Sequence, residues 1–173
     1  MEKQNEKRLV TIKYDQTAKR FIVKDLSDWQ PVADHLAKLL ASGSIVALSG
    51  PLGAGKTTLV QYLARTLGAP KRATSPTFAL IRIYKVRSTR YAVRRGLESY
   101  PITLNATVLR TPYLGVGRLV HVDAYRIEDE KDLIALDLDE ELLDQGTAVL
   151  VEWPENIKGW FKDKNPITVN IEM

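Results

Sequence analysis

Residues 50–58, GPLGAGKTT, restrict the fold of this chain more than any other stretch. They hold three glycines and one lysine, and they directly follow the apolar run SIVALS at 44–49. They satisfy the pattern GxxxxGK[ST], in which glycines give the backbone the dihedral angles needed for successive N–H groups to surround a phosphate. We therefore expect a buried strand, a phosphate-binding loop and a helix that begins at Lys56.

The pattern also assigns chemistry to its members. Its fixed positions are Gly50, Gly55, Lys56 and Thr57. In such a loop the lysine reaches the terminal phosphates of a nucleotide, and the threonine hydroxyl coordinates Mg²⁺. The neighbouring residues expected to contact the nucleotide are Leu52, Gly53, Ala54 and Thr58. A glycine-rich turn that matches by chance is the alternative, and it is disfavoured because glycine makes up only about 7% of residues.

The remaining sequence alternates short apolar runs with helical patterns. Strands are expected at 9–14, 21–24, 44–49, 78–84, 119–125, 147–153 and 166–173. Helices are expected at 27–43, with Ser27 as its N-cap, at 56–68 and at 128–146, and a turn or short helix at 154–163. This order predicts one α/β domain over residues 1–173, in which helices flank a central, mostly parallel sheet behind an N-terminal strand pair.

Two carboxylates end apolar runs. Asp123 follows LVHV and Glu152 follows AVLV, and in open α/β sheets ligands bind beyond the carboxyl ends of the strands. Asp123 is a candidate metal ligand, with a helix cap or turn as the alternative. Glu152, between a buried strand and Trp153, is a candidate base, with a solvated strand end as the alternative. His121 alternates with apolar residues, which favours a position in the core or on the opposite face over a catalytic one.

Composition excludes several classes of protein. The chain has 45% hydrophobic and 27% charged residues, and no apolar run approaches the ~20 residues of a membrane span. Its first ten residues lack the apolar stretch of a secretory signal, so we expect a cytoplasmic protein without a membrane segment. The absence of cysteine excludes disulfides, cysteine-ligated zinc and thiol nucleophiles.

One basic segment stands apart from a chain whose net charge is only +4. Residues 85–118 contain seven basic residues and a single acid, Glu98. Arginines pair with phosphates, and the tyrosines Tyr91, Tyr100 and Tyr113 are suited to stacking on bases, so contact with tRNA is one interpretation. The other is a solvated, hairpin-like insertion, which the alternating stretch ITLNATVL favours over disorder.

Four ordered motifs resemble a known family. GPLGAGKTTL, TSPTF, HVDAYR and VEWPE are similar, in this order, to the motifs of the TsaE (YjeE) proteins, small bacterial P-loop ATPases. The resemblance extends from about Leu26 to Trp160. It implies the P-loop NTPase fold, binding of ATP and Mg²⁺, and association with TsaD and TsaB. It also implies that ATP hydrolysis supports the threonylcarbamoyl modification of adenosine 37 in tRNA.

The resemblance also implies roles for individual residues. Lys56 would contact the phosphates, and Thr57 and Asp123 would hold Mg²⁺. Glu152 would orient or activate the attacking water, with Trp153 beside the nucleotide; Lys56 and Glu152 are thus the expected catalytic residues.

The motif TSPTF also resembles the family, while two features of the chain depart from it. The segment Thr74–Thr77 resembles the family's switch-like loop, which adds Thr77 to the expected nucleotide contacts. Pro51 stands where many members carry an acid. The segment 85–118 is about 25 residues longer than the short hairpin usual in the family, so the resemblance implies nothing about its function.

Three other functions compete with a hydrolase. A small-molecule P-loop kinase would use the arginine-rich insertion as a lid over the transferred phosphate. A nucleotide-gated binding module would bind ATP without hydrolysing it. A GTPase is disfavoured because no NKxD base-reading motif follows the last strands.

Overall fold

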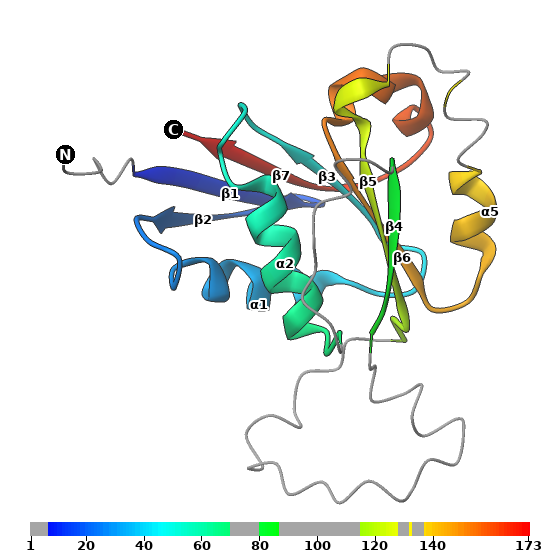
Figure 1. Ribbon diagram of the computed structural model, residues 1–173, viewed down its shortest axis with the longest axis horizontal. Coiled ribbons are helices and arrows are strands. Elements are labelled where there is room, and N and C mark those ends of the chain that lie inside the picture. The colour runs from blue at the N-terminus through cyan, green and yellow to red at the C-terminus, as the bar shows by residue number, and fades with distance from the viewer. Residues whose placement is uncertain (1–6, 70–79, 87–114, 128–131, 133–136) are drawn as a thin grey trace, which may run out of the picture.

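The computed structural model describes residues 7–69, 80–86, 115–127, 132 and 137–173. Seven strands in this part of the chain form one sheet with helices on both faces (Figure 1), in the order β2-β1-β7-β3-β6-β5-β4. The expected mixed α/β architecture is confirmed.

Most elements lie where the sequence predicts them, but the second strand begins at Thr17 rather than at 21, and the first helix is shorter than the expected 27–43. The strands are β1 (Arg8–Tyr14), β2 (Thr17–Val23), β3 (Ile45–Ser49), β4 (Ile81–Lys85), β5 (Arg118–Asp123), β6 (Thr147–Glu152) and β7 (Ile167–Glu172). The helices are α1 (Trp29–Leu39), α2 (Lys56–Thr66) and α5 (Leu138–Leu143), with the 3-10 helices η2 (Ala124–Arg126) and η3 (Pro154–Phe161).

The centre of the sheet is parallel and its margins are antiparallel. β7, β3, β6 and β5 run parallel to one another, whereas β1 pairs antiparallel with β2 and β7, and β4 pairs antiparallel with β5. The expectation of a mostly parallel sheet therefore holds for the central strands only. The reason at one margin is the short turn between Tyr14 and Thr17, since a tight turn can join only antiparallel strands.

Burial differs between central and marginal strands. β6 is buried at every residue, while β7 alternates between buried and exposed residues. A strand covered on both faces is apolar throughout, and a strand covered on one face alternates. β6 therefore lies in the interior of the molecule, which also buries the side chain at its end, Glu152.

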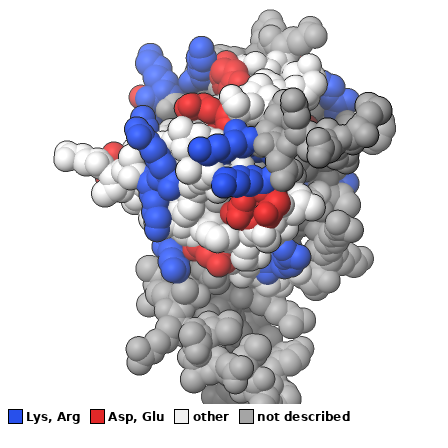
Figure 2. Space-filling view, turned by 90° about the vertical axis from the view of Figure 1, so that its left-hand side faces the viewer, with Lys and Arg blue, Asp and Glu red and all other residues white. Residues whose placement is uncertain are grey.

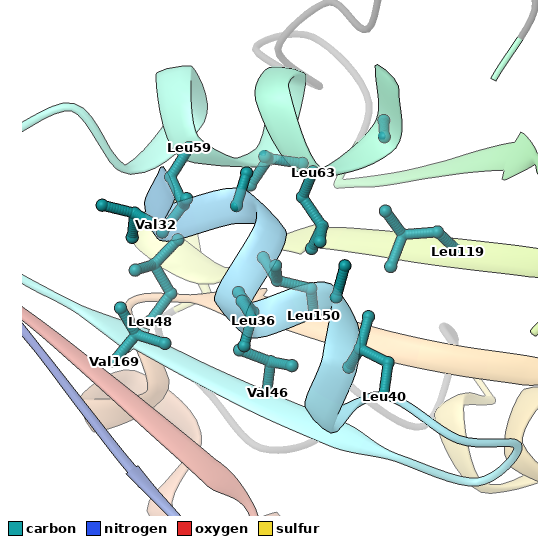
Figure 3. Packing of buried hydrophobic residues seen from close by; sticks show 14 of the residues in the cluster. Val32, Leu36, Leu40, Val46, Leu48, Leu59, Leu63, Leu119, Leu150 and Val169 are labelled. Atoms are coloured by element: carbon teal, nitrogen blue, oxygen red, sulfur yellow. The ribbon is translucent and has the colours of Figure 1, made fainter. Parts of the chain in front are cut away.

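Helices α1 and α2 cover one face of the sheet. Figure 3 shows side chains of both helices directed toward those of the central strands. The labelled members are Val32, Leu36, Leu40, Val46, Leu48, Leu59, Leu63, Leu119, Leu150 and Val169. Full burial of each leucine contributes about 1.5–3 kcal/mol, so this cluster fixes α2, and with it the loop that precedes α2.

A second cluster covers the opposite face of the sheet. Val120 and Val122 of β5 and Val149 of β6 pack with Leu138 of α5 and Ile157 of η3. Successive residues of a strand point to opposite faces. The neighbours of these valines in sequence therefore face α1 and α2.

The register brings the candidate residues to one edge of the sheet. Asp123 is paired with Glu152 across β5 and β6, and Glu152 lies opposite Leu48 of β3. Because these three strands are parallel, their carboxyl ends meet. The glycine-rich loop, which follows Ser49, begins at this same edge.

The predicted start of the first helix is wrong. The N-cap position of α1 is Asp28 rather than Ser27. The Ser27 hydroxyl donates to Asp25 Oδ1 at 2.5 Å, and Asp28 Oδ2 accepts from the backbone N–H groups of Lys24 and Asp25. Both side chains therefore stabilise the turn before the helix, Asp28 through backbone groups and Ser27 through the Asp25 carboxylate, and neither caps the first turn of α1.

The helix expected at 128–146 and the basic segment 85–118 lie only partly within the described residues. Of the helix expected at 128–146, the structure gives α5, and Asp132 is also helical. Of the basic segment 85–118, only the ends are described. Lys85 lies opposite Arg118, and Val86 N–H donates to Gly117 O at 2.9 Å, so the two ends of this segment lie side by side.

Strand β2 is the edge of the sheet at the left of Figure 1. The face that contains this edge carries a row of Lys and Arg side chains along one margin, with Asp and Glu side chains in smaller groups (Figure 2). Lys19 and Arg20 of β2 are exposed. Charged side chains on an edge strand disfavour pairing with the edge of another sheet.

No helix within the described residues is long and apolar enough to span a membrane.

The loop before α2 yields a prediction about stability. Gly55 has φ +101°, and a Cβ there would lie 2.4 Å from Cζ2 of the buried Trp29. Gly55→Ala adds backbone strain and overpacking, together about 3 kcal/mol or more, and should lower Tm by roughly 6–12 °C. Gly53→Ala is the control, since Gly53 has φ +79° but no atom within 4 Å of an added Cβ. Equal losses of Tm in the two variants would show that overpacking against Trp29 adds nothing to the backbone strain.

Candidate functional site

The glycine-rich loop connects the end of β3 to the first turn of α2. Ala54 N–H donates to Pro51 O at 3.2 Å, and Leu59 N–H donates to Gly55 O at 2.9 Å as the first helical bond. The first N–H groups of a helix have no partner within it. Those of α2 therefore form, with the positive end of the helix dipole, a site suited to an anion.

Lys56 is held inside this loop. Its Nζ donates to Gly50 O at 2.6 Å and to Pro51 O at 2.9 Å, and it lies 3.7 Å from the centroid of the Trp153 ring. The residue is only 5% exposed. The ammonium is therefore placed by the carbonyls of the loop and by an aromatic face.

The charge of Lys56 is influenced by its surroundings. Burial lowers the pKa of the Lys56 ammonium below its ordinary value, and the carboxylates of Glu152, Glu155 and Asp123 oppose this change. A buried cation is costly unless nearby groups stabilise it. Three carboxylates thus act on the one cation of the loop.

Glu152 is the most enclosed carboxylate of the site. It is 3% exposed, and its Oε1 lies 3.0 Å from Thr57 Oγ1 and 2.8 Å from His121 Nε2. The Thr57 hydroxyl also lies 3.3 Å from Oε2. The alternative of a solvated strand end is therefore wrong, because Glu152 is buried and hydrogen-bonded to the first turn of α2.

Asp123 has a structural contact as well as a place in the site. Its Oδ1 accepts a hydrogen bond from Tyr125 N–H at 3.2 Å, which caps η2. The sequence had left a cap as the alternative to a metal ligand. The cap is present and the residue also lines the pocket described next, so the two interpretations are compatible.

A pocket of about 560 Å³ lies between the loop and the ends of β5 and β6. It is lined by Leu52, Gly53, Ala54, Gly55, Lys56, Thr57, Thr58, Asp123, Tyr125, Arg126, Glu152 and Trp153. All of these residues except Tyr125 and Arg126 were expected from the sequence. Gly50 takes part through the carbonyl that accepts from Lys56, and Thr77 lies outside the described residues.

The residues that sequence reasoning missed come from the turn after β5. Tyr125 is 53% exposed, and its ring centroid lies 4.9 Å from that of Trp153. Trp153 itself has φ +61°, an uncommon value for a residue with a side chain. Tyr125 and Arg126 stand in the motif HVDAYR, so their closeness to Asp123 in sequence was the available signal.

The oxygen donors of the pocket set what it can bind. Thr57, Asp123 and Glu152 present hydroxyl and carboxylate oxygens, the ligand type that Mg²⁺ prefers. Within the described ranges, no three His, Cys, Asp or Glu side chains are grouped to hold a metal ion. Mg²⁺ is usually bound by one or two protein side chains together with waters and substrate phosphates. The donor set fits a metal that arrives with a phosphate ligand.

Fold and site together define an α/β protein with a glycine-rich anion site at the carboxyl edge of its sheet. The sequence profile described as "Threonylcarbamoyl adenosine biosynthesis protein TsaE" matches residues 23–173. The chain belongs to the TsaE family, which confirms the resemblance of the four motifs.

Individual relatives agree with this assignment. The chain is 41% identical over 123 residues to a TsaE protein from Streptomyces coelicolor, with 70% of this chain and 64% of the relative covered. It is 33% identical over 138 residues to one from Mycobacterium bovis, with 76% and 66% covered. Both carry the name "tRNA threonylcarbamoyladenosine biosynthesis protein TsaE". The chain therefore spans slightly less than two thirds of the length of these relatives.

The crystal structure of Bacillus subtilis YdiB aligns with 88% of this chain and 68% of its own, at 23% identity and a TM-score of 0.48.

The contact between Thr57 and Glu152 yields a prediction about stability. Thr57→Val removes a hydroxyl that donates to a buried carboxylate, and a hydrogen bond to a charged group contributes about 1.5–3 kcal/mol. Urea unfolding should show a loss of that size. Thr57→Ser, the matched control, keeps the hydroxyl and should lose less than about 1 kcal/mol. Equal stability of the two variants would show that the bond contributes nothing.

Proposed function

We propose that this chain is a Mg²⁺-dependent ATP hydrolase with the P-loop NTPase fold, and that it supports threonylcarbamoylation of adenosine 37 in tRNA. The reaction is the conversion of ATP and water to ADP and phosphate. One observation supports it above all: Lys56, Thr57, Asp123 and Glu152, from three separate segments, line one pocket. A phosphate-binding loop, oxygen ligands for a metal and a buried carboxylate are the parts that hydrolysis needs.

The loop is suited to hold the triphosphate. The N–H groups at the start of α2 would surround the phosphates, and Lys56 would pair with the terminal ones. Its present partners are two carbonyl oxygens and the Trp153 ring. A phosphate oxygen is a stronger partner for an ammonium than a carbonyl, because it is charged. Lys56 is thus close to the position in which it would contact a nucleotide.

Thr57 and Asp123 would hold the metal. The Thr57 hydroxyl donates its one hydrogen bond to the Glu152 carboxylate, and its oxygen lone pairs remain for a cation. When bound with the nucleotide, Mg²⁺ neutralises charge on the phosphate oxygens. The bond to Glu152 keeps the Thr57 lone pairs directed away from that carboxylate.

Glu152 would orient the attacking water. A carboxylate accepts hydrogen bonds from water and can take up a proton. Glu152 is buried at the end of β6 and lines the pocket that would hold the phosphates. Trp153, next in sequence, would lie beside the nucleotide.

The position of the basic segment bears on the kinase alternative. Its ends lie at Lys85 and Arg118, whereas Asp123 lies at the opposite end of β5, about 16 Å away at 3.3 Å per residue. Arg118 is paired with Glu141 at 2.7 Å and with Asp144. A lid over the transferred phosphate thus finds no support in the described ends. We propose contact with tRNA for this segment, with a solvated, hairpin-like insertion as the alternative.

Substitution of Glu152 tests hydrolysis. In Glu152→Gln, binding of ATP should be retained while turnover falls by roughly 10²-fold or more, the scale of lost general-base assistance. Phosphate release and binding of a fluorescent ATP analogue are the measurements. Glu155→Gln, which removes a nearby carboxylate of η3, should keep turnover within about 2-fold of wild type.

Further results separate the hydrolase from a nucleotide-gated binding module. Lys56→Ala should abolish binding of ATP. Unchanged turnover in Glu152→Gln would remove Glu152 from its role, and absence of turnover in the wild type would leave a nucleotide-gated binding module.

Association with partner proteins tests the role in tRNA modification. We propose that the chain associates with TsaD-like and TsaB-like proteins, as its resemblance to the TsaE family implies, and we expect it to co-purify with them. Pull-downs would be made with and without ATP, and also with ATP and the Lys56→Ala variant. Association that needs both ATP and Lys56 would indicate nucleotide-dependent docking, and association in all three would indicate direct docking. Loss of association in every arm would contradict the proposed role while leaving the ATPase activity to be judged by turnover.

A further inference from the structure

His121 lies in the middle of β5 and is completely buried. Its Nε2 is 2.8 Å from Glu152 Oε1, and its ring stacks on Tyr84 with centroids 6.3 Å apart at 26°. The sequence predicted a core histidine, and the burial agrees with that. The same side chain nevertheless contacts the carboxylate proposed to orient water.

The direction of the hydrogen bond follows from the chemistry of the two groups. An ionised carboxylate only accepts hydrogen bonds, so Nε2 carries the ring proton and donates a hydrogen bond to Glu152. Thr57 Oγ1 donates to the same oxygen, Oε1, at 3.0 Å. Two donors from different elements, β5 and α2, thus fix one oxygen of Glu152.

The other carboxylate oxygen is held less firmly. Among the described residues, Oε2 contacts Thr57 Oγ1 at 3.3 Å. The same hydroxyl lies closer to Oε1, at 3.0 Å, and it has only one proton to donate. Fixing Oε1 orients the whole carboxylate, since its two oxygens are part of one rigid plane. Oε2 therefore retains lone pairs for a further donor, such as a water molecule.

Packing alone does not explain a histidine at this position. Its Nδ1 is buried without a hydrogen-bond partner in the described part of the chain. A buried, unpaired polar atom costs free energy, which an apolar side chain of similar size would avoid. The imidazole is thus costly as a core residue, and its bond to Glu152 is the compensating contact.

We propose that His121 is a positioning residue that holds Glu152 in the orientation needed to direct water at the terminal phosphate. The inference rests on the proposed ATP hydrolysis. His121 itself does not line the pocket, so it would touch neither the nucleotide nor the water. Because displacement of a catalytic group by about 1 Å can lower a rate by roughly 10²-fold, loss of this bond should lower kcat while leaving ATP binding intact.

The test compares His121→Leu with His121→Gln, the latter able to place an amide N–H near the position of Nε2. In His121→Leu, kcat for phosphate release should fall by about 10-fold or more, with KM and ATP affinity within about 2-fold of wild type. His121→Gln should recover part of the loss. His35→Leu, the control, removes the other histidine, which lies on α1 against Phe21, and should leave kcat unchanged.

A double variant separates positioning from general damage to the fold. In the Glu152→Gln background, His121→Leu should lower kcat by less than about 2-fold more, because residues that act through one another are not additive. Should His121→Leu fail to fold, His121→Gln and His121→Asn decide the matter. Asparagine places its amide near Nδ1 instead, so kcat should be higher with glutamine.

The outcomes distinguish this inference from the proposed function. An active wild type with unchanged kcat in His121→Leu, or with equal kcat in the Gln and Asn variants, would overturn the inference alone. A full additional loss of kcat in the Glu152→Gln background would overturn it as well. A wild type that releases no phosphate, alone or with its partners, would overturn the proposed hydrolysis together with it.

Discussion

The hydrogen bond between Thr57 and Glu152 connects the phosphate-binding loop and α2 to the strand ends that carry the carboxylates. Thr57 belongs to the first turn of α2 and Glu152 to the end of β6, 95 residues later. α2 is fixed by the packing of Leu59 and Leu63 on the sheet, and β6 by burial on both faces. The bond therefore joins two elements that the core already holds, so little further conformational entropy is lost when it forms.

Strand register determines which other groups reach this bond. Because β5 and β6 are parallel with Asp123 opposite Glu152, His121 lies two residues back on the face that Glu152 occupies, toward α2. A register shift of one residue would direct His121 and Asp123 to the other face. The sheet thus places the metal-ligand candidate Asp123, the candidate base Glu152 and the histidine bonded to that base on one face, with the first two lining a single pocket.

Sequence reasoning succeeded where the signal was local. The pattern GxxxxGK[ST] predicted the strand, loop and helix around Lys56, and the acids at the ends of apolar runs were found because strand ends share one sheet edge. It failed where the outcome depends on competing or distant contacts. Ser27 bonds to Asp25 instead of capping α1, and neither the Gly55–Trp29 approach nor the His121–Glu152 bond has a sequence pattern, because both depend on tertiary packing.

A crystal structure with Mg²⁺ and a non-hydrolysable ATP analogue tests the central claim most directly. We expect the triphosphate within the loop of residues 50–58, the metal on Thr57 and Asp123, and the Glu152 carboxylate facing the terminal phosphate while still bonded to His121. An analogue bound elsewhere, or phosphates in the loop with Glu152 turned away from them, would contradict the account.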